Sequence, residues 1–291
     1  MHRRTFVRGL GAALALPSAL PAALRPTARR APAGTPARAR VERIGLQLYS
    51  LRDAARADLA RALADIAAIG YREVELLDSM QNFGTPPARL RQTLDRLHLT
   101  APSTHISTAA LDDLPRLVGD AHTLGHAYVV VASLPDGQRS TLDDYRRWAD
   151  RFNAAGERLR RDGLWLAFHD EPENFAPIDG QVPYDVLVAR TDPAHVRLQL
   201  DTGNAAIGGR DPLAYMDRYA DRYWSFHMKD APRLGAAHDA ELGTGVVDVR
   251  RILARAAPLA DKHVFVEQES YPGAPIDSVR RDYAYLAALT F

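Results

Sequence analysis

The chain alternates between short runs of β-branched and aromatic residues and longer segments rich in Ala, Leu and Arg. The short runs have the length and composition of buried strands, and the longer segments repeat their apolar positions at helical spacing. This alternation predicts a parallel sheet with crossover helices. The expected strands are 44–48, 73–76, 100–103, 127–131, 165–169, 196–201, 223–227 and 263–267. The expected helices are 58–69, 87–97, 111–124, 142–162, 184–189, 211–219, 249–257 and 276–289.

Glycine marks several points where an expected helix ends and a strand follows. Gly70, Gly125 and Gly163 hold this position, where a helix cap often requires a left-handed residue. Repeated units of this kind fill residues 41–291, and a length of about 250 residues is typical of one (β/α)₈ barrel. We therefore predict an α/β fold, a single TIM barrel over 41–291, with no second domain.

The first residues have the pattern of a targeting signal. The pair Arg3-Arg4 precedes an uncharged run over 9–24 that is rich in Ala and Leu, which is the arrangement of a twin-arginine export signal. The run is shorter than the ~20 residues that span a bilayer, and two prolines interrupt it, so we expect no stable membrane anchor. We predict a signal peptide over 1–25, a flexible linker over 26–40 and a periplasmic or otherwise exported protein. A short uncleaved anchor is the alternative.

The composition of the chain excludes some classes of metal site, and its charge gives no reason to expect some classes of partner. The chain has no cysteine, so neither a disulfide framework nor a thiolate metal site is available. Lys and Arg together number 37 against 36 Asp and Glu, a net charge of +1, which gives no electrostatic reason to expect nucleic acid. A small-molecule partner fits best, and nothing in the sequence predicts an oligomeric state.

Polar residues gather where the expected strands end. In a TIM barrel the carboxyl ends of the strands converge on one face, and chemistry takes place there. Four such residues, from four successive strands, form the predicted metal site: His169, Asp201, His227 and Glu267. Two imidazoles and two carboxylates suit Mn²⁺, Zn²⁺, Co²⁺ or Fe²⁺, with Mg²⁺ also compatible, and suit Ca²⁺ less. Taken singly, these residues have simpler explanations. A lone His at a strand end is often a hydrogen-bonded core residue, and a strand-end Asp is often a helix cap.

Further residues are candidates for catalysis or substrate binding. We expect Glu75 to point toward the barrel mouth as a proton carrier or an acceptor for a substrate hydroxyl; a barrel-interior ion pair is the alternative. His105 is a candidate donor to a substrate oxygen. Lys229 is a candidate stabiliser of an enolate oxygen or else the salt-bridge partner of Asp230 or Asp248. The candidate substrate-binding residues are Tyr49, Glu269 and Glu241, the last in a glycine-containing loop able to close over a ligand.

Several short motifs together resemble the xylose isomerase-like, or sugar phosphate isomerase/epimerase, superfamily. They include Gly-Leu-Gln-Leu-Tyr-Ser from residue 45, Phe-His-Asp-Glu from 168, His-Met-Lys-Asp from 227 and Val-Glu-Gln from 266. The resemblance spans 41–291 and implies that Asp201, His227 and Glu267 are metal ligands. Strand five departs from the pattern of similar proteins, because Glu171 stands where a second His is common. Glu171 is therefore either the free carboxylate base or a loop charge.

One chemical step unites the activities that this resemblance implies. A metal that binds a carbonyl and its neighbouring hydroxyl lowers the energy of the enediolate formed when a base removes the adjacent proton. Reprotonation gives an isomerase or epimerase of a nonphosphorylated sugar, which is the leading prediction. Loss of a β-substituent gives a lyase, and a 3-keto-glycoside lyase or hydrolase is the runner-up. A noncatalytic exported sugar-binding protein and an abasic-site endonuclease are the remaining alternatives.

Overall fold

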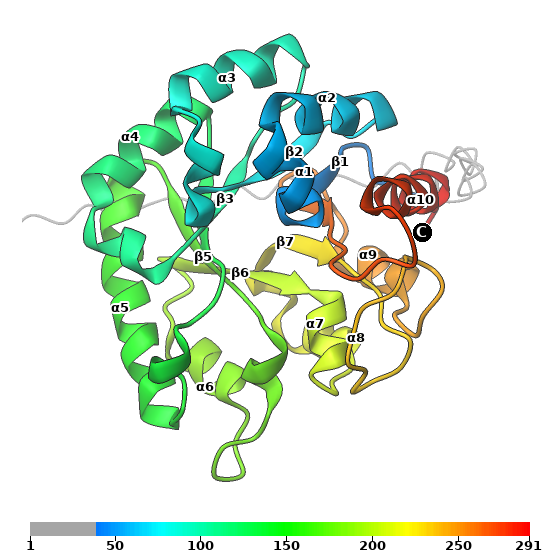
Figure 1. Cartoon of the computed structure of the whole chain (residues 1–291). Coiled ribbons are helices and arrows are strands. Elements are labelled where there is room, and N and C mark those ends of the chain that lie inside the picture. The colour runs from blue at the N-terminus through cyan, green and yellow to red at the C-terminus, as the bar shows by residue number, and fades with distance from the viewer. Residues whose placement is uncertain (1–38) are drawn as a thin grey trace, which may run out of the picture. The chain divides into compact units, whose positions relative to one another are not determined.

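Eight parallel strands close into a barrel within residues 39–291, the part of the chain that this computed structural model describes (Figure 1). Each strand pairs with the next along the sequence, and β8 pairs with β1. The predicted single TIM barrel is therefore confirmed. The predicted signal peptide and almost all of the predicted linker lie outside the described residues. The strands are β1 Ile44–Gln47, β2 Glu73–Leu77, β3 Ser103–Ile106, β4 Tyr128–Val131, β5 Trp165–His169, β6 Val196–Asp201, β7 Tyr223–Met228 and β8 His263–Val266.

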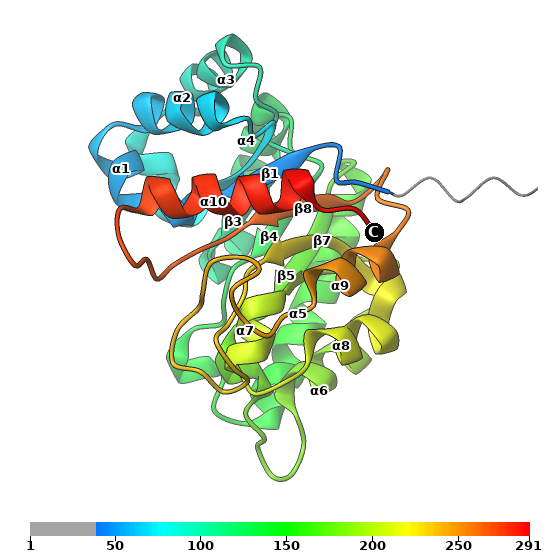
Figure 2. The same cartoon turned by 90° about the vertical axis from the view of Figure 1, so that its right-hand side faces the viewer.

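Helices cover the outside of the barrel. Figure 2 shows α10 lying across β1 and β8, the two strands whose pairing closes the sheet. None of the helices within residues 39–291 is long and apolar enough to cross a membrane. The helices are α1 Arg52–Ala57, α2 Leu59–Ile69, α3 Pro87–Arg96, α4 Leu114–Leu124, α5 Leu142–Arg161, α6 Pro183–Arg190, α7 Thr202–Ile207, α8 Pro212–Tyr219, α9 Val249–Ala256 and α10 Pro275–Ala288.

The third strand lies three residues later than predicted, at Ser103–Ile106 instead of 100–103. Pro102 has no backbone N–H to donate to a ladder, so the continuous pairing with β4 starts only at Ser103. The shift places His105 inside the strand, where its side chain points into the barrel. The helix that follows likewise begins at Leu114, later than the predicted 111, because Asp113 caps it by accepting a hydrogen bond from the Arg116 N–H.

Packing of α5 shows how the outer layer fixes a site strand. Its buried residues include Tyr145, Trp148 and Phe152, at the spacing of one helix face. The Phe152 ring lies 5.6 Å from the ring of Phe168, which points outward from β5 next to the inward-pointing His169. Burial of rings of this size contributes about 1.5–3 kcal/mol each, so α5 holds β5 and its terminal His firmly in register.

Candidate active site

Side chains that point into the barrel form stacked polar layers, because residues two apart on a strand share a face. On β6 these are Gln199 and Asp201, and on β7 they are Ser225 and His227; all four are buried. The upper layer carries the predicted metal ligands and the lower layer carries smaller or amide side chains. The barrel register aligns the upper layer directly, since Asp201 pairs with His227 across β6 and β7.

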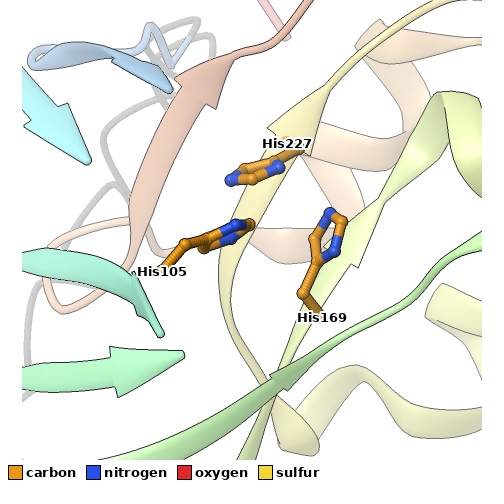
Figure 3. A group of neighbouring side chains, drawn as sticks. All are labelled: His105, His169 and His227. Atoms are coloured by element: carbon orange, nitrogen blue, oxygen red, sulfur yellow. The ribbon is translucent and has the colours of Figure 1, made fainter. Parts of the chain in front are cut away.

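The four predicted metal ligands lie together at the carboxyl ends of β5 to β8. Each offers one ligand atom, and these atoms all lie within 4.8 Å of one another. His169 Nε2 is 3.5 Å from Asp201 Oδ2, and His227 Nδ1 is 3.0 Å from Glu267 Oε2. Figure 3 shows the rings of His169 and His227 turned toward each other, with His105 beside them. The structure thus brings together residues that are far apart in the sequence.

One buried ligand atom of this group lacks a hydrogen-bond partner. Asp201 does cap α7, as the simpler explanation expects, but only through Oδ1, which accepts from the Asn204 N–H at 2.8 Å, and its Oδ2 is ion-paired with Lys229 Nζ at 2.8 Å. The Nε2 of His169 is buried and has no hydrogen-bond partner within residues 39–291, although it lies 3.5 Å from Asp201 Oδ2. A buried polar atom without a partner costs about 1–3 kcal/mol. A divalent ion coordinated by His169 Nε2 and Asp201 Oδ2 would remove that cost, so these residues fit a metal site.

Charge at the site is balanced by Lys229, which is buried at the end of β7. Its Nζ lies 2.8 Å from Asp201 Oδ2, 2.9 Å from Glu267 Oε2 and 2.6 Å from Glu269 Oε1. Burial would lower the pKa of Lys229, but these carboxylates outweigh burial and raise that pKa well above its usual value. Gly203 makes room for the lysine stem, because a Cβ there would lie 2.3 Å from Lys229 Cγ. The partners predicted for a structural Lys229, Asp230 and Asp248, are not the ones it contacts.

Glu171 borders the cavity next to His169, as a candidate base should. Its Oε1 lies 3.8 Å from His169 Nδ1, and its Oε2 accepts a hydrogen bond from Asn204 Nδ2 at 3.3 Å. Burial raises the pKa of Glu171 to about 7, although His169 opposes the shift. Asn204 also accepts from Lys229 Nζ at 3.2 Å, so one amide joins the candidate base to the buried lysine.

A cavity of about 350 Å³ opens above these residues. His105, His169, Glu171 and Glu267 line it. Two of the four predicted ligands, His169 and Glu267, thus border a space large enough for a small molecule. Tyr49 and Glu269 also line it, as expected for substrate-binding residues. The rest of the lining comes from Leu77, Ser79, Ile106, Ser107, Thr108, Ala132, Ser133 and Pro135.

Glu241 lies away from this cavity. Its carboxylate accepts from Ser278 Oγ at 2.7 Å and from the Arg281 guanidinium, both on α10. The surrounding loop is fixed by further hydrogen bonds, because Asp230 accepts from the backbone N–H groups of Gly243, Gly245 and Val247. The structure therefore does not place Glu241 among substrate-binding residues. The loop that carries Glu241 is held by its hydrogen bonds to α10 and to Asp230.

Glu75 does not point toward the mouth as predicted. It is fully buried below His227, and its Oε2 lies 2.5 Å from His227 Nε2. Burial would raise its pKa, but His105 and His227 outweigh burial and lower the pKa to about 2. Glu75 is the third residue of β2 and its side chain points into the barrel below the strand ends. The alternative interpretation of Glu75, a carboxylate in an ion pair inside the barrel, therefore fits the structure, but its partner is a histidine and not Arg or Lys.

His105 points into the same buried layer and reaches the cavity floor. Its ring centroid lies 4.8 Å from that of His169 and 5.2 Å from that of His227. Its Nε2 lies 2.8 Å from Gln199 Oε1, and burial lowers its pKa to about 4. Gln199 was absent from the predicted site, although its position two residues before Asp201 is a signal that it shares the inner face. Asn204 is likewise a site residue that the strand-end pattern does not predict, because it lies beyond β6, in α7.

Known protein families and curated proteins show similarity to this chain. Residues 63–289 match the model of the xylose isomerase-like TIM barrel family. Inosose dehydratase of Lacticaseibacillus casei is 27% identical over 192 residues, which cover 58% of this chain and 62% of that protein. Inosose dehydratase of Geobacillus kaustophilus is 26% identical over 194 residues, covering 58% and 61%. The chain thus spans about three fifths of the length of these curated relatives.

Solved structures share the fold over most of the chain. A sugar phosphate isomerase/epimerase from Parabacteroides distasonis has a TM-score of 0.71 at 23% identity, covering 88% of this chain and 98% of that one. The IOLI protein with a bound zinc atom has a TM-score of 0.63 at 12% identity, covering 83% and 95%. Identities this low show a common architecture. The family match over most of the barrel goes further: this chain belongs to the xylose isomerase-like TIM barrel family.

Proposed function

We propose that this protein is a divalent-metal-dependent enzyme that removes the proton beside a carbonyl of a nonphosphorylated sugar or sugar-like ligand, as an isomerase or epimerase. The observation that carries the proposal is the convergence of four buried residues, since one ligand atom of each of His169, Asp201, His227 and Glu267 lies within 4.8 Å of the others. The Nε2 of His169 has no hydrogen-bond partner among residues 39–291. These four residues would hold the ion. When bound, a divalent ion stabilises negative charge that develops on a substrate oxygen.

Glu171 is placed to act as the base. It lines the cavity, and its carboxylate is held by one amide hydrogen bond that leaves lone pairs free. Glu269 lines the same cavity from beyond the end of β8, paired with Lys229. Because Glu171 and Glu269 follow strands that are not neighbours, one carboxylate can remove a proton from one side of a substrate carbon and the other can return a proton from a different side. This arrangement favours isomerisation or epimerisation.

The lining of the cavity favours an uncharged substrate. Among the described residues, neither Arg nor Lys lines it, and the one buried cation nearby, Lys229, is already surrounded by three carboxylates. Phosphate and carboxylate groups are usually bound by Arg or Lys, so nothing here compensates such a charge. Ser79, Ser107, Thr108 and Ser133 instead offer hydroxyl groups, which suit the hydroxyls of a sugar or cyclitol.

A lyase is the second candidate, and the relatives named inosose dehydratase favour it. A dehydratase shares the first proton removal and then loses a hydroxyl from the neighbouring carbon. Glu269, which lines the cavity and is paired with Lys229, is the candidate to donate a proton to the departing oxygen. The export prediction makes the substrate one that occurs outside the cytoplasm, and a 3-keto-glycoside is the lyase substrate that this prediction favours.

The proposal is tested by stripping the protein with a chelator, reloading it with Mn²⁺, Zn²⁺ or Co²⁺, and following sugars in deuterated water by NMR. The panel contains free sugars, 3-keto sugars, glycosides and a keto-cyclitol. We expect metal-dependent deuterium incorporation beside the carbonyl of at least one member, with the product spectrum separating isomer from elimination product. Binding of a sugar without exchange would indicate the noncatalytic alternative. Incision of an abasic duplex would indicate the endonuclease.

A further inference from the structure

Beneath the proposed metal ligands, one buried carboxylate collects an unusual number of donors. Glu75 accepts hydrogen bonds from Gln47 Nε2 at 2.8 Å, from Ser103 Oγ at 2.6 Å and from Gln199 Nε2 at 3.0 and 3.1 Å. His227 Nε2 lies 2.5 Å from its Oε2. The side chain is 0% exposed. A carboxylate so occupied is ionised and has neither the access nor the lone pairs to take a proton from a substrate.

These contacts determine which nitrogen of His227 carries a hydrogen. An ionised carboxylate only accepts, so the nitrogen that faces Glu75 at 2.5 Å, Nε2, must be the donor. The other nitrogen, Nδ1, faces Glu267 Oε2 at 3.0 Å and Asp201 Oδ2 at 3.8 Å. In the neutral ring Nδ1 then holds the lone pair, and it holds it among the other proposed ligand atoms.

The same carboxylate sets the state of His105, directly through a 3.3 Å contact between His105 Nε2 and Glu75 Oε2 and also through an amide. Gln199 Nε2 donates to Glu75 and to Ser225 Oγ at 3.0 Å, so its amide orientation is fixed. Its Oε1 therefore faces His105 Nε2 at 2.8 Å and requires a hydrogen on that nitrogen. The lone pair of neutral His105 is left on Nδ1. In that tautomer His105 can accept a hydrogen bond from a ligand but cannot donate one.

We propose that Glu75 is a positioning residue that fixes the tautomers of two histidines, so that His227 binds metal through Nδ1 and His105 acts as an acceptor. The inference rests on the metal site of the proposed function and deepens it. It also reverses the donor role expected for His105. A carboxylate behind a metal-ligating histidine orients the ring and raises the basicity of the ligand nitrogen, and loss of such a partner typically costs 10–100-fold in metal affinity.

The first test uses the wild-type protein loaded with Zn²⁺ and labelled with ¹⁵N-histidine. Long-range ¹H–¹⁵N spectra at neutral pH report which ring nitrogen carries a hydrogen and which binds zinc. We expect His227 to show a protonated Nε2 with zinc on Nδ1, and His105 to show a protonated Nε2. Zinc on Nε2 of His227, or a hydrogen on Nδ1 of neutral His105, would overturn the inference while leaving the metal site intact. Absence of zinc binding would instead overturn the proposed function.

The second test compares Glu75→Gln with a matched control two residues earlier on β2. Glu73 is 2% exposed and its Oε2 accepts from His263 Nδ1 at 2.6 Å, so Glu73→Gln also removes a buried carboxylate from a histidine. It does so one inward-facing position earlier on β2, further from the strand ends. We expect Glu75→Gln to weaken zinc binding 10–100-fold in a chelator competition and Glu73→Gln to leave it unchanged. Equal affinities of Glu75→Gln and wild type would refute the positioning role. Should Glu75→Gln fail to fold, the wild-type spectra decide alone.

Discussion

Lys229 Nζ lies 2.8 Å from Asp201 Oδ2, the oxygen that also faces His169. A buried ammonium therefore neutralises carboxylates that the account assigns to a metal. In a metal-free protein this pairing limits repulsion between Asp201 and Glu267, and in a loaded protein the same positive charge opposes the ion. Stability of the free protein and affinity for metal should thus respond to Lys229 in opposite directions.

Replacement of Lys229 by Met tests that opposition. We expect the metal-free variant to unfold at a lower temperature, because Asp201 and Glu267 lose the buried cation that they share, and removal of one partner of a buried ion pair costs about 3–5 kcal/mol. Zinc affinity should rise, because a like charge next to the ion has been removed. Scanning fluorimetry in chelator and a zinc titration measure the two effects. Lys262→Met is the control, since Lys262 donates to the Ala256 carbonyl and lies outside the cavity. Unchanged stability together with unchanged affinity would refute the electrostatic account.

Loss of the proposed base should leave the metal in place. Glu171→Gln keeps the shape of the side chain and its contact with Asn204, but cannot take a proton. Deuterium incorporation into the substrate should fall about 10²- to 10⁴-fold, the usual contribution of a general base, with metal content unchanged. Glu173→Gln is the control, because that neighbouring carboxylate pairs with Arg139 and does not line the cavity. If Glu171→Gln exchanges deuterium at the wild-type rate, another group moves the proton.

Asp282 should make stability depend on pH at a place far from the metal ligands. Burial raises its pKa to about 7, against about 3.9 in an unfolded chain. The folded state thus favours the protonated form, so this contribution is complete below about pH 4 and is lost as the pH rises through 7. Its Oδ1 accepts from the Leu242 N–H, whereas its Oδ2 accepts no hydrogen bond from a described residue.

Asp282→Asn removes the charge and retains the acceptor for Leu242. The variant should therefore gain thermal stability over wild type at pH 8 relative to pH 5, and each kcal/mol corresponds to roughly 2–4 °C in a protein of this size. Asp277→Asn, an exposed substitution on the same helix, should show no such trend. Melting curves across this pH range provide the measurement. A stability difference that is the same at pH 5 and pH 8 would contradict the assignment.

Export can be tested independently of the barrel. Twin-arginine translocation reads the arginine pair directly, so replacing Arg3 and Arg4 with Lys should leave the protein in the cytoplasm. Fractionation and immunoblotting of cells that express each form would show it. Recovery of the Lys variant from the periplasm at unchanged yield would contradict the signal assignment.

The sequence predicts the strand order and the upper layer of the site because both follow simple periodic rules. β5 and β6 begin and end where expected, since β5 is an apolar run that stops at His169, and the alternating apolar positions of β6 stop at Asp201. In a TIM barrel the carboxyl ends of the strands converge on one face. The residues at those ends could therefore be predicted to lie together: His169, Asp201, His227 and Glu267. The family comparison confirms the fold but leaves these individual residue roles as predictions.

The lower layer could not be predicted in the same way. Whether Glu75 reaches the mouth or stays inside depends on the register of β2 against β3 and β1, which decides that Ser103 and Gln47 donate to it. Its contact with Gln199 crosses the barrel interior, between β2 and β6. Glu241 illustrates a second limit, because a loop residue next to glycines can face a ligand or a helix, and only packing against α10 decides between them.

The central claim is most directly tested by metal content. Wild type, Asp201→Ala, His227→Ala and the control Glu241→Ala would be dialysed against Zn²⁺, freed of excess ion and analysed for bound zinc and for folding. We expect one zinc per chain in wild type and in Glu241→Ala, and only traces in folded Asp201→Ala and His227→Ala. Stoichiometric zinc in both of those variants, or none in wild type, would contradict the proposed metal site.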